Sequence, residues 1–549
     1  MNLLKLCRMM SDYKKRRNEL CGKKIIPAVA VLSTITFSSV FAAPPSQNPA
    51  EQNRYIDVQM LGINDFHGQL DTVKKINNKE AGGADYLATY LKERKKQNPN
   101  TLLVHAGDIV GASPPVSALL QDEPTIEFLN DLKFDVGTIG NHEFDEGIDE
   151  MKRLIYGGYH EKTGNFKGAN FPYVAANFYN KSTGRLFLPP FTVKMVDGVP
   201  VGFIGVVTTD TPNVVMPTML KNVQITDEVE AINKSTQQLK RLGVKSIVVL
   251  AHVGGTTDES GVTNGDLTRI ANETDPEVDV IFGGHSHTYV NGTVNNKLIV
   301  QANSYGTAFS DVDVTIDRKT KDIIKKKAEV VTTYHEGVEP DKQVKKKLDQ
   351  YKEKIAPLVN EVVGKSTASI DRKQNDAGES TLGNLVADAQ RQTMQTQIAL
   401  MNPGGIRNDL DAGDITWGEL YGIQPFGNQL IKVDLTGQDI RDILNQQWQK
   451  GTTRMLQISG IQYAWDANKP NGEKVTNIRL TNGEELSPSK TYSVVANAFL
   501  ASGGDGFISF KNGKNAETGP NDFEALVDYV KQLKEPIQPV IDGRIQKVN

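Results

Sequence analysis

Short apolar runs rich in valine, isoleucine and leucine recur along the first half of the chain, separated by amphipathic stretches. The runs that predict strands are 58–64, 101–106, 134–139, 201–207, 246–251 and 278–282. Stretches typical of helices lie between them, for example 84–97 and 228–242. Continuous apolar strands that alternate with helices predict an α/β core with a buried sheet. The shorter alternating run 311–316 predicts an antiparallel strand.

A charged, helix-prone segment at 343–362 separates this region from a second one that also has α/β character. We interpret it as a linker helix broken at Pro357; a solvated surface helix of either domain is the alternative. The second region has predicted helices at 381–393 and 436–448 and glycine-rich turns at 402–407 and 503–506. The predicted organisation is a flexible leader at 43–54, a domain at 55–340, a linker helix at 341–363 and a domain at 364–549.

The N-terminus has the pattern of an export signal. Residues 1–24 hold eight basic and two acidic residues, and the uncharged apolar run 25–42 follows them. A small-residue pattern predicts cleavage near Ala42, so 1–42 is interpreted as a signal peptide. An uncleaved anchor is the alternative, which Pro27 and the short length of the run disfavour. We therefore expect a secreted or cell-envelope protein, periplasmic in a Gram-negative cell, that meets the membrane only during export.

Composition narrows the classes of function. The chain has 549 residues, of which 38% are hydrophobic and 23% charged, which excludes a disordered or polytopic membrane chain and predicts two or more domains. Cys7 and Cys21 both precede the predicted cleavage point, so the exported chain has no disulfide and no thiolate ligand. The net charge is −4 despite the basic N-terminus, and this acidic body argues against a nucleic-acid polymer as partner.

Carboxylate, amide and imidazole side chains follow several of the predicted strands. The candidate metal ligands are Asp65, His67, Asp108, Asn141, His252, His285 and His287. Groups at the carboxyl ends of strands converge on one crevice of an α/β sheet. On an extended segment, residues two positions apart face the same way, which would bring Asp65 beside His67 and His285 beside His287. The set suffices for two divalent ions, zinc, manganese, magnesium or cobalt, if Asp108 bridges them.

The residues after Asn141 predict the chemistry of this site. Two ions about 3.5–4 Å apart lower the pKa of a bound water and clamp phosphoryl oxygens. His142, when protonated, would stabilise the charge that builds on a phosphoryl or leaving oxygen. Asp145 would hold the other ring nitrogen and keep the imidazole basic. A helix start capped by Asn141 is the alternative for this motif, and His105 is expected to pack in the core.

The motifs, taken in order, resemble the calcineurin-like metallophosphoesterase family, and in detail the secreted bacterial and ecto-5′-nucleotidases. They are Asp-x-His at 65–67, Gly-Asp at 107–108, Gly-Asn-His-Glu-Phe-Asp at 140–145, Ala-His at 251–252 and Gly-His-Ser-His at 284–287. The resemblance runs from Tyr55 to the C-terminus. It implies a four-layer α/β metallophosphoesterase domain with a β-sheet sandwich, a linker helix and a separate α/β 5′-nucleotidase C-terminal domain.

The resemblance also implies roles for single residues. One ion would be held by Asp65, His67, Asp108 and His287, and the other by Asp108, Asn141, His252 and His285. The catalytic dyad would be His142 and Asp145. Segments in the second half resemble those that contact the phosphate, ribose and base. The implied substrate-binding residues are Asn402, Gly404, Gly405, Arg407, Phe426, Asn428, Phe499 and Asp505.

Two features of the second half have other interpretations. Core packing is the alternative for Phe426 and Phe499, because it is the usual fate of an apolar aromatic side chain. The related nucleotidases carry an arginine just before Glu-Ser-x-Leu-Gly-Asn, whereas this chain has Asn-Asp-Ala-Gly at 375–378, and its nearest cations are Arg372 and Lys373. This departure leaves room for cyclic phosphates, diphosphates or sugar nucleotides.

We therefore expect a secreted metal-dependent nucleotide phosphohydrolase whose substrate is AMP, ATP, a UDP-sugar or a cyclic nucleotide. A 2′,3′-cyclic-nucleotide 2′-phosphodiesterase with 3′-nucleotidase activity is the enzymatic alternative. A non-catalytic nucleotide-sensing protein and a protein phosphatase are alternatives of other classes. We expect a monomer or weak dimer, and the resemblance implies a rotation between the domains, for which 343–362 is the candidate hinge.

Overall fold

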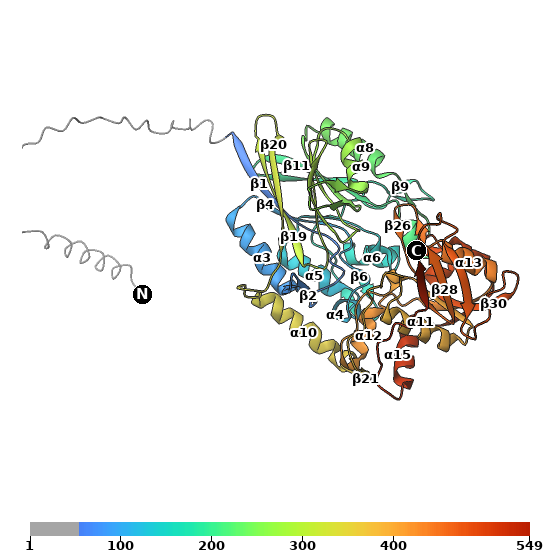
Figure 1. The fold of residues 1–549 in the computed structure, drawn as a ribbon. Helices are drawn as coiled ribbons and strands as arrows, with labels where there is room; N and C mark the ends of the chain where they lie inside the picture. The colour runs from blue at the N-terminus through green and yellow to red at the C-terminus, as the bar shows by residue number, and fades with distance from the viewer. Residues whose placement is uncertain (1–53) are drawn as a thin grey trace, which may run out of the picture. The chain divides into compact units, whose positions relative to one another are not determined.

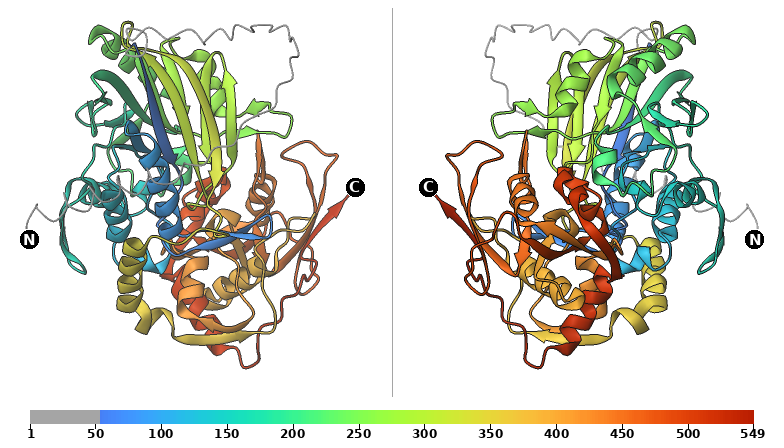
Figure 2. Two further views of the ribbon diagram at one scale, coloured as in Figure 1. Left: turned by 90° about the vertical axis from the view of Figure 1, so that its left-hand side faces the viewer. Right: turned by 90° about the vertical axis from the view of Figure 1, so that its right-hand side faces the viewer.

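The computed structural model describes residues 54–549. The predicted signal peptide at 1–42 and the predicted leader up to residue 53 lie outside the described residues. The first sheet has the strand order β20–β19–β1–β4–β5. Its strands are β1 (Tyr55–Ile63), β4 (Thr101–Ala106), β5 (Val136–Thr138), β19 (Ala308–Asp317) and β20 (Asp322–Thr332). The first three run parallel, and β19 joins β1 antiparallel, which confirms the antiparallel strand predicted at 311–316. Figure 2 shows β1, in blue, beside the yellow-green strands that follow much later in the chain.

A second sheet has the order β10–β11–β13–β16–β18–β17. Its strands are β10 (Phe191–Val196), β11 (Val199–Val207), β13 (Ser246–His252), β16 (Val278–Phe282), β17 (Tyr289–Val294) and β18 (Lys297–Ala302). The four inner strands run parallel, and the two edge strands pair antiparallel. Their continuous apolar runs are buried on both faces, as the sequence predicts.

The two sheets pack face to face and helices cover their outer faces (Figure 1). Met60 and Val104 of the first sheet share one apolar cluster with Phe203 and Val248 of the second. The first sheet is covered by α3 (Ala84–Gln97) and α5 (Glu123–Leu132), and the second by α8 (Glu228–Arg241) and α9 (Asp266–Glu273). The N-terminal half therefore has the predicted four layers, helix, sheet, sheet and helix.

The C-terminal half is a separate mixed α/β unit of secondary structure. Its main sheet consists of β27 (Gln457–Ser459), β22 (Ile398–Met401), β30 (Thr491–Asn497), β24 (Gln429–Thr436) and β31 (Lys514–Asn521), in that order. A small sheet is formed by β29 (Val475–Leu480), β28 (Ile461–Asp466) and β32 (Ile545–Val548). One apolar cluster joins α11 (Thr381–Met394), α12 (Trp417–Ile423) and α15 (Asp522–Gln532), and another contains α13 (Gly437–Asn445).

Helix α13 is shorter than the predicted helix at 436–448. Thr436 is its N-cap: its hydroxyl accepts the amide of Asp439, and the carboxylate of Asp439 accepts the amide of Thr436. This capping box fixes the start of the helix. The helix ends at Asn445 because the chain then enters the hairpin of β25 (Trp448–Gln449) and β26 (Thr452–Thr453). Among residues 54–549, no helix combines the length and apolarity needed to cross a bilayer.

The charged segment between the two halves forms α10 (Lys342–Val359). The prediction that Pro357 breaks the helix is wrong, because this residue lies in the last turn, where the helix is about to end anyway. Val344 and Leu348 are buried in the apolar cluster of the N-terminal half. The first turns of the helix are thus tied to that half, while its end also contacts α12 of the C-terminal half.

His105 packs in the core, as expected, although it lies in the strand that leads to the candidate site. Its ring meets those of Tyr173 at 4.9 Å and Phe171 at 5.7 Å, and is fully buried. Gly137 leaves the space for it, since a Cβ there would lie 1.9 Å from the His105 Nε2. Burial lowers the pKa of His105 to about 3.

This buried, neutral histidine predicts a pH-dependent loss of stability. Between pH 6.5 and about 3 the unfolded chain binds a proton at His105 that the folded chain does not, so stability falls with falling pH. We expect the difference in free energy of unfolding between the wild type and His105→Leu to fall by about 1.4 kcal/mol per pH unit from pH 6 to 4.5. Urea denaturation of both metal-free proteins measures it; a difference independent of pH would contradict a neutral His105.

Candidate active site

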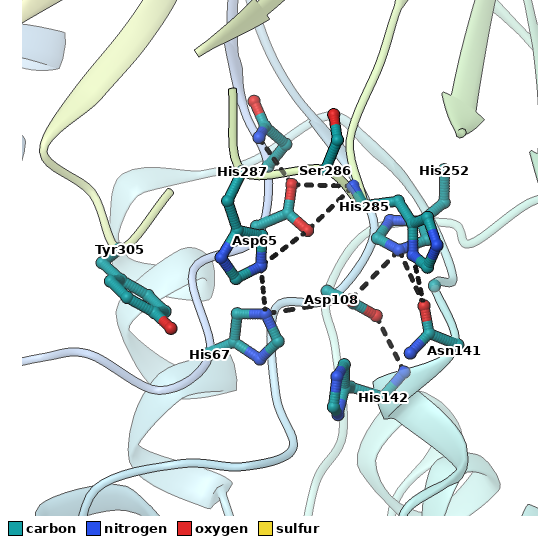
Figure 3. A network of polar contacts seen from close by, with 12 residues as sticks. Asp65, His67, Asp108, Asn141, His142, His252, His285, Ser286, His287 and Tyr305 are labelled. Atoms are coloured by element: carbon teal, nitrogen blue, oxygen red, sulfur yellow. Dashed lines mark hydrogen bonds and ion pairs between the residues drawn. The ribbon is translucent and has the colours of Figure 1, made fainter. Parts of the chain in front are cut away.

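The candidate ligands lie at the carboxyl ends of parallel strands from both sheets or in the loops directly after them (Figure 3). Asp65 and His67 follow β1, Asp108 follows β4, Asn141 follows β5, His252 ends β13, and His285 and His287 follow β16. Because the two sheets pack face to face, the ends of these strands meet at one edge of the sandwich. The structure thus brings all seven predicted donors together.

Neighbouring donors converge for a different structural reason from the one expected from the sequence. The expectation of extended segments at 65–67 and 285–287 is wrong, because five of the seven donors have left-handed backbone with φ between 49° and 75°. These five are Asp65, His67, Asp108, His285 and His287. Non-glycine residues adopt this conformation at an energetic cost and keep it where the surrounding structure enforces it, which is typical of functional sites.

One set of donors centres on Asp65. The Nε2 atoms of His67 and His287 are 3.2 Å apart, and His287 Nε2 is 3.4 Å from Asp65 Oδ1. The Asp65 carboxylate is oriented by the side-chain amide of Asn64 at 2.6 Å and by the backbone amide of His285 at 2.9 Å. These contacts aim an oxygen and two ring nitrogens at one point.

A second set centres on Asn141. Its Oδ1 is 3.1 Å from His252 Nε2 and 2.9 Å from His285 Nδ1. Asp108 Oδ2 lies 3.0 Å from His252 Nε2 and 3.8 Å from His67 Nε2, so this carboxylate faces both sets. Its position is the one that the bridging role requires.

Backbone carbonyls hold two of the rings in the correct tautomer for metal binding. His67 Nδ1 donates to Gly111 O and His252 Nδ1 donates to Ala106 O, both at 2.9 Å. A ring that donates from Nδ1 presents the lone pair of Nε2 to the cluster. Carboxylate, amide and imidazole donors without sulfur fit a divalent ion of the zinc, manganese or cobalt type.

The charges of the cluster indicate what an ion would replace. Burial alone would lower the pKa of His252, but the carboxylates of Asp108 and Asp65 raise it to about 9. Burial would raise the pKa of Asp108, yet His252 and His142 hold it well below its usual range. Protons on the imidazoles therefore balance the charge of the ionised carboxylates, and an ion that binds here must displace those protons.

The predicted dyad lies at the rim of the cluster. His142 Nδ1 is 2.8 Å from Asp145 Oδ2, and the His142 backbone amide donates to Asp108 Oδ1 at 2.8 Å. Burial disfavours the charged imidazole, but Asp145 and Asp108 outweigh it and raise the pKa of His142. The ring stacks with that of Phe426 at 5.8 Å, so it faces the C-terminal half.

Glu143 is a supporting residue that the sequence analysis did not single out. Its buried carboxylate accepts the backbone amides of Asp108, Ile109 and Gly140. It thereby ties the loop after β4 to the loop after β5. Burial, and then the charge of Asp108, raise its pKa to about 7. The one feature of the sequence that could have pointed to Glu143 is its position directly after His142.

A cavity of about 370 Å³ lies between the donors and the C-terminal half. All eight predicted substrate-binding residues line it: Asn402, Gly404, Gly405, Arg407, Phe426, Asn428, Phe499 and Asp505. The dyad, Asp108, Asn141, His285 and His287 line the opposite side. Sequence analysis missed Val214, Val215, Met216, Ser286 and Asn497, which carry no chemical signature.

The aromatic residues of the cavity are not core residues. Phe426 and Phe499 are half-buried and line the cavity, whereas Phe507 and Phe510 nearby are buried in the core. Core packing, the alternative interpretation, is therefore wrong for both. The guanidinium of Arg407 lies 5.7 Å from the ring centre of Phe426.

Polar contacts hold the other wall of the cavity. Asn402 Nδ2 donates to Asp505 Oδ2 at 3.0 Å, and Asn497 Nδ2 donates to Asn402 Oδ1 at 2.9 Å. Arg454 Nε is 3.3 Å from Asp505 Oδ1. Burial raises the pKa of Asp505, and Arg454 opposes this. The carboxylate is thus fixed in place while remaining at the cavity wall.

The segment 375–378 brings no cation to the cavity. Asn375 Oδ1 accepts the amides of Ala377 and Gly378, which closes a turn. Arg372 donates to Ile406 O at 3.3 Å and lines a separate hollow of about 410 Å³. Of the basic residues in the second half, Arg407 is the one that lines the cavity.

Comparisons with known proteins cover the same two regions. Residues 59–289 match the family of calcineurin-like phosphoesterases, and residues 362–512 match the 5′-nucleotidase C-terminal domain. The chain is 44% identical to Endonuclease YhcR of Bacillus subtilis over 94% of its own length and 43% of that protein. It is 39% identical to Cell wall protein Lmo0130 of Listeria monocytogenes, over 91% and 70% of the two chains. Its fold matches the 5′-nucleotidase precursor from Thermus thermophilus with a TM-score of 0.78 and 29% identity, over 90% and 100% of the two chains.

The donor geometry predicts that divalent ions stabilise the folded chain through Asp108. Ligation at about 100 times the Kd adds about 2.7 kcal/mol, so we expect Mn²⁺ or Zn²⁺ to raise the Tm of metal-stripped protein by roughly 5 °C. Asp108→Asn should lose most of this rise. Asp279→Asn, which changes a buried carboxylate outside the cluster, should keep it. Equal rises in all three proteins in a thermal shift assay would contradict the assignment.

Proposed function

Because the chain belongs to the calcineurin-like phosphoesterase family, with a 5′-nucleotidase C-terminal domain, and hydrolyses phosphoric esters, we propose that its substrates are nucleotides. One observation carries this proposal. A single cavity has the metal donors and the dyad on one side and two half-buried phenylalanines, an arginine and a carboxylate on the other. This combination suits a planar base, a ribose and a phosphoryl group in one ligand.

The proposed cofactor is a pair of divalent ions held by the two sets of donors that share Asp108. When bound, the ions would supply a Lewis acid for the phosphoryl group and acidify water. Asp145 holds Nδ1 of His142, which leaves Nε2 to donate a proton or hydrogen bond to a phosphoryl or leaving oxygen. The products would be a nucleoside and phosphate.

The C-terminal half would bind the rest of the nucleotide. Phe426 and Phe499 offer aromatic faces that accept any base, because every base has a π face. Asp505, held by Asn402 and Arg454, would accept hydrogen bonds from the ribose hydroxyls. Arg407 would bind phosphate oxygens with its planar fork of donors.

A second hollow favours phosphodiesters as a further substrate class. It has a volume of about 690 Å³ and shares His285 and Ser286 with the first cavity. Hydroxyl and amide side chains and the carboxylates of Asp210 and Asp266 line it, and no lysine or arginine is among its lining residues. This lining suits an uncharged, hydroxyl-rich group that is attached to the phosphorus opposite the nucleoside, such as the sugar of a UDP-sugar. It suits additional phosphate groups less well.

The proposed place of action is outside the cytoplasm, after cleavage near Ala42. The signal pattern at 1–42 supports it. A nucleic-acid polymer is not proposed as substrate, since the chain beyond its basic N-terminus is acidic. The name of Endonuclease YhcR describes a protein of which this chain spans 43%. A monomer or weak dimer is proposed.

Phosphate release from defined substrates tests the proposed function. We expect the metal-stripped chain without residues 1–42 to regain hydrolysis of AMP, ATP, UDP-glucose or 2′,3′-cyclic AMP when manganese, zinc, magnesium or cobalt is added singly. His142→Ala should bind the same amount of metal and lose about 10²–10⁴-fold in kcat. No hydrolysis of any nucleotide with any metal would overturn the proposal. Turnover of the cyclic substrate alone would favour the phosphodiesterase alternative.

The aromatic side chains predict a substrate-dependent change in KM. Loss of stacking on one ring costs about 1–3 kcal/mol per base, so Phe426→Ala and Phe499→Ala should raise KM for AMP roughly 10-fold or more. The KM for p-nitrophenyl phosphate should stay within about 2-fold, because this ester needs no base pocket. Phe191→Ala, a half-buried phenylalanine of β10, is the matched control. Equal changes on both esters would indicate a structural role instead.

A further inference from the structure

Tyr305 lies beside the metal donors His67 and His287 (Figure 3), contacts Arg407 of the C-terminal half, and has no part in the chemistry described so far. It lies in the loop between β18 and β19. Its ring is edge-on to the rings of His67, with centres 5.7 Å apart, and His287, at 5.3 Å. Its hydroxyl is 3.5 Å from Nη2 of Arg407. The Tyr305 side chain therefore contacts two candidate metal ligands of the N-terminal half and also the guanidinium of Arg407 in the C-terminal half.

The backbone of Tyr305 is held in a conformation that an aromatic residue rarely adopts. Its φ is 63°, in the left-handed region. Its amide donates to the carbonyl of Asp65 at 2.8 Å, and the next residue, Gly306, has no room for a side chain because a Cβ would lie 2.9 Å from Phe66. A strained residue persists where its surroundings determine it, so this loop delivers the Tyr305 ring to a fixed place.

Arg407 needs such a partner to be oriented. Within residues 54–549, the Tyr305 hydroxyl is the one hydrogen-bond acceptor of the Arg407 side chain, and its buried Nε has no partner. The guanidinium is otherwise bordered by the face of Phe426. With one N–H of Nη2 turned to the hydroxyl, the remaining N–H groups of Nη1 and Nη2 are the donors for phosphate oxygens.

A lysine of the N-terminal half holds the same loop from a second side. Lys74 lies in β2 (Val73–Ile76), and its Nζ donates to Asn408 Oδ1 at 3.3 Å. The same Nζ is 5.9 Å from the ring centre of Tyr305. Tyr305 and Lys74 thus bind neighbouring residues, Arg407 and Asn408, of the loop that carries the proposed phosphate contact.

We propose that Tyr305 is a positioning residue that docks Arg407 against the metal donors, so that the guanidinium and the metal cluster grip the same phosphoryl group. The inference rests on the proposed role of Arg407. The Tyr305 hydroxyl orients Arg407 through its hydrogen bond, and the Tyr305 ring packs against His67 and His287.

A double-mutant cycle with Tyr305→Phe and Arg407→Met tests this role. Tyr305→Phe keeps the ring and removes the hydroxyl, so we expect kcat/KM for p-nitrophenyl phosphate to fall roughly 10-fold. In the Arg407→Met background the same change should have no effect, since the partner is gone. Tyr289→Phe, an exposed tyrosine of β17, is the control and should leave kcat/KM unchanged. An equal loss in both backgrounds, or no loss in either, would overturn the proposal.

Readouts other than turnover separate positioning from a structural role. Tyr305→Phe should keep the Tm and the bound metal of the wild type, and should weaken the binding of inorganic phosphate several-fold in calorimetry. A lower Tm or metal content with unchanged phosphate affinity would refute the positioning role. The aryl ester and inorganic phosphate contain no nucleoside, so both experiments test the positioning role of Tyr305 independently of nucleotide hydrolysis. If the wild type hydrolyses no nucleotide, that outcome overturns the proposed function alone.

Discussion

One constraint governs how the site is built: lone-pair donors and carboxylates face one another in a buried cluster around Asp108. Atoms such as the Nε2 nitrogens of His67 and His287, 3.2 Å apart, repel each other unless a proton or a metal ion lies between them. The surroundings must therefore be rigid enough to hold them together. Two stacked sheets whose strands end at one edge supply that rigidity, and Glu143 ties two of the loops to each other through three backbone amides.

The same rigidity explains why backbone strain collects at this edge. Five of the seven donors and Tyr305 have left-handed φ values. Extended segments would also bring Asp65 beside His67 and His285 beside His287, but the chain turns directly after the strands, and these donors converge through left-handed turns instead. The conformational cost is offset by the packing of the apolar cluster between the sheets, which lies directly behind the site.

Each half of the protein contributes one side of the cavity. The N-terminal half provides the donors, the dyad and most of the lining of the second hollow. The C-terminal half provides the aromatic faces, Arg407 and the Asn402–Asp505–Arg454 contacts. The cavity that contains the donors and the dyad is lined by residues of both halves. Recognition and chemistry therefore depend on how the halves meet, and the contacts of Tyr305 and Lys74 with the 402–408 loop lie at that junction.

The sequence by itself predicted the central strands of the two N-terminal sheets, the limits of α3, α8 and α11 to within a residue, and the candidate ligands. Apolar runs between turns have few other ways to be buried, and motif order is a property of the chain alone. Only the tertiary structure decided where α13 ends, that α10 continues past Pro357 to Val359, and that Phe426 and Phe499 line the cavity. It alone revealed the left-handed turns, Glu143, Tyr305 and the second hollow. These features arise from contacts between residues far apart in the chain, and a pattern of neighbouring residues carries no information about such contacts.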